Sequence, residues 1–252
     1  MSENRHQHAA GQVIERHRHE EHQLVYVIRG VLAVRTDRGA WVACADRAIW
    51  MPAGTWHEHR VYGASEILTL MFPVRDAPLD GGAPTVVAVS ALLRELLLAA
   101  TEPGLGTGEA SRLHAVLRDR LRRAHDQPLT LPEARDPRLA HACRLVTDDL
   151  SRPRTTAWLA RRTGTSERTL SRLFRLEFGT TYPQWRTTTK VFHAMVQLAE
   201  GASVTQTAHR CGWATPSAFV ETFTRTMGRT PGSYRATPPQ RQPREHPPRG
   251  SG

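Results

Sequence analysis

Two segments of the chain, about 50 residues apart, carry the same order of residue types and constrain the fold more than any other feature. Ala160 lies four positions before Gly164, and Ala208 lies four positions before Gly212. A hydroxyl residue and a new apolar helical stripe follow each glycine. This is the order of a helix-turn-helix, because the alanine lets two helices approach closely and the glycine takes the turn between them.

The second helix of each segment has its own start signals. Ser166 and Thr215 are side chains that can cap it, and Pro216 suits its first position. A single motif of this kind is weak evidence, because many helical hairpins share it. Two in tandem, within a basic segment, predict a DNA-binding module.

Positive charge is concentrated around the two motifs. The 252 residues carry a net charge of +10. Residues 1–85 hold 9 Arg and 10 Asp/Glu, whereas residues 137–236 hold 15 Lys/Arg against 6 Asp/Glu, a net of +9. This is the electrostatic footprint of a polyphosphate partner, and a solvated basic surface is the alternative.

The pattern of apolar and turn residues predicts an α+β chain with four regions. Short apolar runs between turn residues predict a β-barrel or sandwich in residues 1–85. Residues 86–136 are expected to hold helices at 86–100 and 111–124, a possible dimerisation region, and a proline-rich linker from 126. Residues 137–236 form the tandem helix-turn-helix domain, and the tail 237–252 is expected to be disordered. The helices expected in the third region are 138–150, 155–162, 166–177, 181–199, 204–210, 216–227 and 231–235.

The third region also resembles a known family. The residues that carry the likeness are 159–174, Gly179, 182–186, Ala208, 212–213, 217–219, Phe223 and 228–235. They resemble the AraC/XylS family of bacterial transcription regulators. The resemblance implies two helix-turn-helix units, joined by a long helix, that insert recognition helices into successive major grooves.

The resemblance also implies which side chains face DNA. The positions are Arg168, Ser171 and Arg172 in the first unit and Pro216, Ser217, Val220 and Glu221 in the second, with Arg175, Arg186 and Arg225 as further contacts. Arg168 and Arg172, one turn apart, could each bind guanine N7 and O6 or a phosphate. Glu221 could accept from cytosine N4 or face water. We therefore expect the first unit to carry more of the sequence discrimination.

The first region contains a histidine pattern. His17, His19, Gln23 and Gly30 are followed by 52–57, which reads Pro-Ala-Gly-Thr-Trp-His. This resembles both motifs of the cupin superfamily, a small double-stranded β-barrel that often serves AraC/XylS regulators as a sensor. Gln23 stands where many metal-binding cupins have glutamate; Asp46 and Val61 replace a usual glycine and asparagine.

The pattern raises the question of a metal. His17 and His19 are two residues apart on a strand and can face the interior together, with His57 and Gln23 arriving from neighbouring strands. Three imidazoles and one neutral oxygen suit Zn²⁺, Mn²⁺, Ni²⁺ or Fe²⁺. The alternative is a polar pocket wall without metal. His22 and His59 are expected to face outward, and the effector pocket is expected among Tyr26, Trp50, Met51, Trp56 and Phe72.

These features favour a DNA-binding transcription regulator controlled by a small-molecule or metal effector, and not an enzyme. A metal-dependent cupin enzyme of the dioxygenase or isomerase type is the alternative, but it leaves the tandem motif unexplained. A DNA-binding architectural protein without sequence preference is a third. Expected partners are double-stranded DNA, RNA polymerase and a second copy paired through the apolar faces of 86–100 and 113–121, which could equally pack on the barrel. Three distant cysteines, no signal peptide and no membrane-length apolar run predict a cytoplasmic protein.

Overall fold

The computed structural model describes residues 3–79, 82–124 and 130–234. Its strands form one eight-stranded sheet in which every pairing is antiparallel. The strands are β1 (Glu3–His8), β2 (Val13–His17), β3 (His22–Thr36), β4 (Gly39–Cys44), β5 (Arg47–Met51), β6 (His57–Phe72), β7 (Thr85–Ala88) and β8 (Thr130–Pro132). The long strands β3 and β6 pair from His22–Phe72 to Arg35–Glu58 and form the centre of the sheet.

The helices agree closely with the expected ranges. They are α1 (Ala91–Ala99), α2 (Thr107–Arg122), α3 (Pro137–Thr147), α4 (Thr156–Arg162), α5 (Glu167–Phe178), α6 (Tyr182–Ala199), α7 (Val204–Arg210) and α8 (Pro216–Met227), with short 3₁₀ turns η1 (Val74–Asp76) and η2 (Pro231–Tyr234). The caps expected at Ser166 and Thr215 are confirmed, since their side chains accept from Thr169 N–H and Ala218 N–H. The α+β class is therefore confirmed, with the sheet first and the helical region last.

A bulge in β3 exchanges the two faces of that strand. The β3–β6 register shifts on both sides of Arg29, and Gly30 there has φ +89°. A Cβ at Gly30 would lie 1.9 Å from Ser65 Oγ, so only glycine fits. Consequently Val25 and Val27 face the interior before the bulge, and Leu32 and Val34 face it after the bulge.

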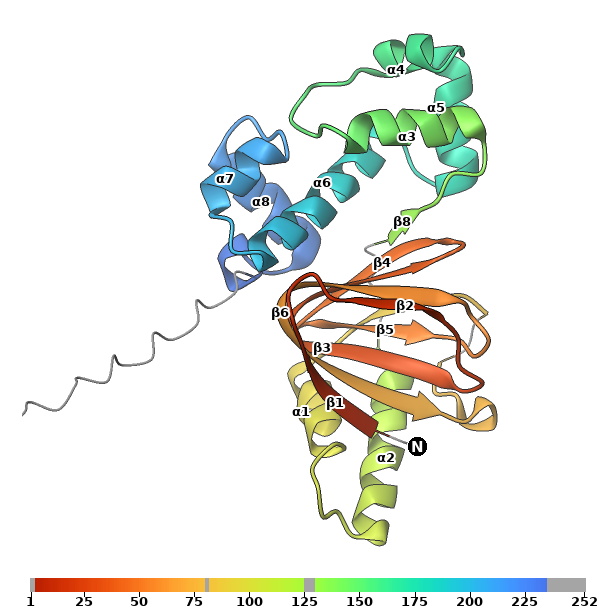
Figure 1. Cartoon of the computed structure of the whole chain (residues 1–252), viewed down its shortest axis with the longest axis vertical. Helices are drawn as coiled ribbons and strands as arrows, with labels where there is room; N and C mark the ends of the chain where they lie inside the picture. Colours follow the sequence, from red (N-terminus) through yellow and green to blue (C-terminus); the bar gives the residue numbers. More distant parts are fainter. Residues whose placement is uncertain (1–2, 80–81, 125–129, 235–252) are drawn as a thin grey trace, which may run out of the picture.

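The sheet buries apolar side chains in three places. Val25, Leu32, Ile49 and Met51 belong to the interior cluster. One part of the outer face packs on α1 and α2, and another part packs on α6, α7 and α8. In Figure 1, α1 and α2 lie below the strands and α6 lies above them. The helix-turn-helix region is thus packed directly onto the barrel.

Three expectations about the middle of the chain need correction. Residues 86–88 are not helical, because β7 pairs with β5 and α1 begins only at Ala91. The expected linker contains β8, which pairs with β4. The sheet therefore extends beyond residues 1–85, since it includes most of β7 and all of β8. The tail at 237–252 lies outside the described residues.

The apolar stripe of the two helices after the barrel has a partner within the chain. Leu93 and Leu97 of α1 and Leu117 and Leu121 of α2 are at most 1% exposed. They pack against the outer face of the sheet in one cluster with Leu24. Of the two alternatives left open by the sequence, packing on the barrel thus accounts for this stripe.

Candidate functional site: DNA-binding helices and a histidine cluster

The two helix-turn-helix units are built in the same way. In each, the alanine is buried and its carbonyl accepts a backbone hydrogen bond across the turn: Thr165 N–H to Ala160 O, and Trp213 N–H to Ala208 O, both 2.9 Å. The turn glycines, Gly164 and Gly212, have φ +63° and +72°. The close approach and the left-handed turn inferred from the sequence are thus confirmed.

The first recognition helix, α5, presents a row of cations. Arg168, Arg172 and Arg175 are exposed, and none forms an ion pair within the part of the chain that the structure describes. Ser171 is half-buried beside them. On the opposite side, Leu170, Leu173 and Phe174 are buried among α3, α4 and Trp185. Unpaired arginines on a well-anchored helix can bind DNA without first breaking an internal contact.

The second recognition helix, α8, is less cationic. Ser217 and Glu221 are exposed, and the Glu221 carboxylate lies 3.7 Å from the Arg225 guanidinium. Pro216 and Val220 are half-buried, and Val220 packs against the core formed with the barrel. The helix α8 therefore presents fewer exposed, unpaired side chains to DNA than α5 does.

Arg186, which was expected to contact DNA, has partners within the protein. It is half-buried on α6, and its Nη2 donates to the carbonyls of Leu150 at 3.3 Å and Arg152 at 2.7 Å. Both carbonyls lie in the loop between α3 and α4. Arg186 consequently ties the first unit to the long helix.

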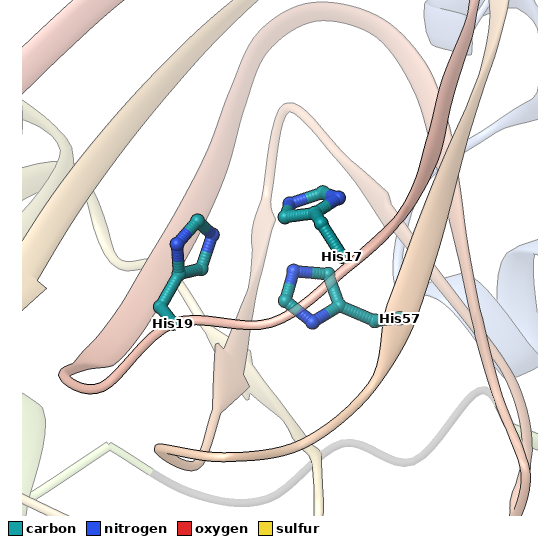
Figure 2. Close-up of side chains that lie close together, drawn as sticks. All are labelled: His17, His19 and His57. Atoms are coloured by element: carbon teal, nitrogen blue, oxygen red, sulfur yellow. The ribbon is translucent and has the colours of Figure 1, made fainter.

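Four histidines gather inside the barrel mouth. His17, His19 and His57 each place one side-chain nitrogen within 4.8 Å of those of the other two. Figure 2 shows their rings turned toward a common point, with His17 and His19 on one segment and His57 on the neighbouring strand. The His59 ring lies 5.1 Å from that of His57 and 5.5 Å from that of His17.

His59 was expected to face outward, and that is wrong. It is 3% exposed and shares the inward face of β6 with His57, since residues two apart on a strand point the same way. The same rule, applied to His57 and His59, could have found it from the sequence. His22 lies outside the cluster: its ring stacks on Trp50 and its Nδ1 accepts from Ala53 N–H at 3.1 Å.

Backbone hydrogen bonds and burial determine the chemistry of the cluster. His17 Nδ1 lies 2.7 Å from Glu15 O and His57 Nδ1 lies 2.8 Å from Thr55 O, so these Nδ1 atoms donate and Nε2 keeps its lone pair. Burial lowers the pKa of His57 to about 4 and that of His59 to about 3. Burial, together with His17, also lowers the pKa of His19.

Several buried polar atoms beside the histidines have no partner. His57 Nε2, His59 Nε2 and Gln23 Oε1 make no hydrogen bond within the described residues. Gln23 Nε2 lies 3.3 Å from His19 Nε2, which places the amide at the edge of the cluster. Unpaired buried polar atoms are costly, so two imidazole nitrogens without a partner at a convergent histidine trio fit a divalent cation.

The expected aromatic pocket needs correction. Tyr26 and Trp50 are fully buried on the outer face of the sheet, packed against α1 and α2, because they alternate with the inward residues of β3 and β5. Phe72 lies with them, whereas Met51 does face the interior. Trp56 is 42% exposed and lies outside the barrel, with the guanidinium carbons of Arg16 and Arg18 at 5.5 and 5.0 Å from its ring.

Comparison with known proteins identifies the two domains that hold these residues. Residues 159–237 match the family model of the helix-turn-helix domain, and residues 5–72 match that of the cupin domain. The chain is thus a transcription regulator that joins an N-terminal cupin domain to a C-terminal helix-turn-helix domain.

The relatives have the same character. The chain is 27% identical over 221 residues to the HTH-type transcriptional regulator NimR of Escherichia coli K12, covering 86% of this chain and 81% of NimR. Among solved structures, an AraC-type regulator from Chromobacterium violaceum is 27% identical, with a TM-score of 0.39, over 42% of this chain and 96% of that one. ToxT of Vibrio cholerae is 12% identical, with a TM-score of 0.40, over 92% of this chain and 96% of ToxT. No described helix has both the length and the hydropathy to cross a membrane.

Proposed function

We propose that this regulator senses a divalent metal ion through its cupin domain, with His17, His19 and His57 as ligands and His59 beside them. The observation that carries the proposal is the convergence of three imidazoles, together with the buried Nε2 atoms of His57 and His59, which have no partner within the described residues. Zn²⁺, Mn²⁺, Ni²⁺ or Fe²⁺ would suit such a donor set. Because one ion binds nitrogens at about 2.1 Å, the rings would close by small side-chain rotations.

The ligands would hold the ion in a partly open position. His17 and His19 are half-buried, so an ion can enter from solvent, whereas His57 is 1% exposed and anchors the site. The backbone bonds of His17 and His57 orient both rings before an ion arrives. Since burial keeps His57 and His59 neutral, binding at neutral pH releases no proton from them.

A single strand connects the histidines to the DNA-binding domain. His57 and His59 lie on β6, and farther along this strand Gly63 meets the end of α6. A Cβ on Gly63 would lie 2.3 Å from Ala199 O, so the two backbones are in contact. A shift of β6 on metal binding would therefore move α6, which joins the two units. Metal binding can change DNA affinity only if it favours one arrangement of the two units over another, and the contact between β6 and α6 would provide this preference.

We infer that the histidine site serves regulation and not catalysis. In support, side chains of the interior cluster such as Val27, Ile49 and Met51 fill the space inside the sheet, where a cupin enzyme would need room for substrate. As further parts of the proposal, the regulator acts in the cytoplasm and contacts RNA polymerase at its promoters. A second copy would pair through exposed apolar side chains such as Leu92 and Val116, since the buried stripe of α1 and α2 is already covered.

The test is metal content together with DNA affinity. Full-length protein, loaded with Zn²⁺, Mn²⁺, Ni²⁺ or Fe²⁺ and then desalted, is expected to retain one ion per chain by elemental analysis. Its affinity for a DNA site chosen by selection should differ at least fivefold between loaded and EDTA-treated protein. His57→Ala should lose both effects. His6→Ala, which changes an exposed histidine on β1, should lose neither.

Two outcomes would contradict the proposal. Retention of none of the four metals would exclude the site as a metal sensor. Retention without any effect on DNA affinity would leave a structural ion and exclude sensing.

A further inference from the structure

A cleft of about 500 Å³ lies where the sensor domain meets the end of α8. One wall comes from the sensor domain, with Leu93 of α1 and Arg120 and Arg123 at the end of α2. The other wall comes from the DNA-binding domain, with Met227 and Arg229. The cleft is distinct from the histidine cluster, and its volume is in the range of small-molecule sites.

The charge of this cleft is unbalanced. None of its three arginines, Arg120, Arg123 and Arg229, forms an ion pair with any residue that the structure describes. Arg122, on the same turn of α2 but outside the cleft, is paired with Asp119 at 3.0 Å. Three unpaired cations around one hollow favour an anion there.

The one carboxylate in the lining is already engaged. Asp46 accepts hydrogen bonds from Cys44 Sγ at 3.0 Å and from Tyr234 Oη at 3.1 Å. It is therefore held against the sheet and η2, and it forms no ion pair with the arginines of the cleft. The three arginines, all exposed, thus remain available to an anion from solution.

The remaining lining is apolar. Leu93 and Met227 are at most 2% exposed and form part of the floor, together with Val89 and Ala124. The first turn of α1, capped by Ser90, also opens on the cleft, where its dipole favours negative charge. A ligand that fits both the cations and the floor has an anionic head and an apolar body.

We propose that this junction is a second effector site, which binds a small organic anion with an apolar body, either a carboxylate or a phosphate ester. The head would lie between Arg120 and Arg123 of α2 and Arg229 of the DNA-binding domain. Because Gly228 ends α8 immediately before Arg229, an anion shared by both walls would hold α8 to the sensor domain. The anion would thereby favour the docked arrangement of the second unit.

The binding test uses 8-anilinonaphthalene-1-sulfonate, a fluorescent anion with an apolar body. One molecule is expected to bind per chain, and Arg120→Gln/Arg123→Gln should weaken binding at least tenfold. Arg122→Gln is the matched control and should bind as the unaltered protein does. His57→Ala should also retain binding, which separates this site from the metal site. None of the four substituted residues belongs to the apolar core of α1 and α2, so the fold should be retained, and circular dichroism checks it.

Competition identifies the head group. Benzoate or phenyl phosphate should displace the probe, whereas uncharged benzamide should not, and the stronger competitor distinguishes a carboxylate ligand from a phosphate ester. Equal probe binding by the double variant and the unaltered protein would overturn the proposal. The proposal would also be overturned if benzamide displaced the probe as effectively as benzoate and phenyl phosphate do.

Coupling to DNA is measured in the same proteins. Saturating probe is expected to change the affinity for a selected DNA site at least threefold in the unaltered protein and in Arg122→Gln, but not in Arg120→Gln/Arg123→Gln. An unchanged affinity with bound probe would overturn the regulatory part of the proposal. A weaker DNA affinity of the double variant without probe, and with no change in probe binding, would overturn the whole and assign these arginines to DNA phosphates.

Discussion

Lys190 Nζ donates a hydrogen bond to the carbonyl oxygen of Gly212, 2.5 Å away. This bond joins the long helix α6 to the turn of the second helix-turn-helix unit. One helical turn earlier, Arg186 donates to the carbonyls of Leu150 and Arg152, in the loop between α3 and α4 of the first unit. Two cations on one face of α6 therefore hold both units, and this fixes the separation of the recognition helices along DNA.

Removal of the Lys190 amine should loosen the second unit. Lys190→Met keeps the apolar stem over Trp213 but leaves the Gly212 carbonyl without its charged donor. Partial burial already lowers the pKa of Lys190 to about 8, which offsets part of the gain from the bond. We therefore expect a loss of about 1 kcal/mol in the free energy of unfolding. Urea unfolding followed by tryptophan fluorescence measures it, with Arg225→Met as an exposed control; an unchanged midpoint would contradict the prediction.

Gly212 should tolerate alanine less well than Gly179 does. Both glycines have positive φ, +72° and +66°, so alanine costs about 1–2 kcal/mol at either one. At Gly212, however, the new Cβ would also lie 2.3 Å from Leu150 O, whereas at Gly179 no atom lies within 4 Å. Gly212→Ala should cost at least a further ~1–3 kcal/mol, the usual range for overpacking. Equal thermal stability of the two variants would show that the Leu150 contact does not constrain the turn.

Arg172 should contribute to sequence discrimination. Arg172→Ala is expected to weaken binding to a selected site by ~1–3 kcal/mol and to relax the preference at one base pair. The side chain is exposed and unpaired within the described residues, so the fold should not change. Arg175→Ala serves as comparison and should lower affinity uniformly across sequences, with a smaller salt slope. Fluorescence anisotropy over a set of single-base variants distinguishes the two, and an unchanged preference for Arg172→Ala would exclude a base contact.

Acid should destabilise the metal-free protein at a pH set by the buried histidines. The pKa of His57, about 4, and that of His59, about 3, lie below the unfolded value of about 6.5. Between these values the unfolded chain binds more protons than the folded chain, so stability falls as pH decreases through 6.5. The slope is up to ~1.4 kcal/mol per pH unit for each histidine. Thermal unfolding in EDTA from pH 7.5 to 4.5 measures it. His57→Gln should flatten the slope, and an equal slope in this variant would assign the effect to other groups.

Much of the DNA-binding domain was predictable, because its signals are local. Caps such as Ser203 with Gln206, the glycine turns and the helical spacing of Leu170 and Phe174 depend on residues three or four apart. These short-range rules fixed nearly every helix between 137 and 234. The role of Arg186 was not predictable in this way, since its partners Leu150 and Arg152 are more than 30 residues away.

The barrel was harder to predict for the same reason. The histidine trio followed from its spacing, but the inward position of His59 and the outward positions of Tyr26 and Trp50 depend on strand register. The bulge at Gly30 changes that register within one strand. The pairing of β8 with β4 joins residues about 90 apart, and three residues of strand carry no recognisable periodicity.

The packing of α8 against the barrel attaches the second helix-turn-helix unit to the sensor domain more firmly than the first. Val31, Ala33, Val42 and Cys44 of the sheet share a core with Phe219 and Phe223, so the second unit cannot leave the barrel without exposing this apolar surface to water. The first unit has its own separate core around Phe174 and is joined to the rest through α6 and the segment after β8. During a search along DNA, the second unit therefore moves together with the sensor domain, and the first unit follows through its connections to α6 and to the segment after β8.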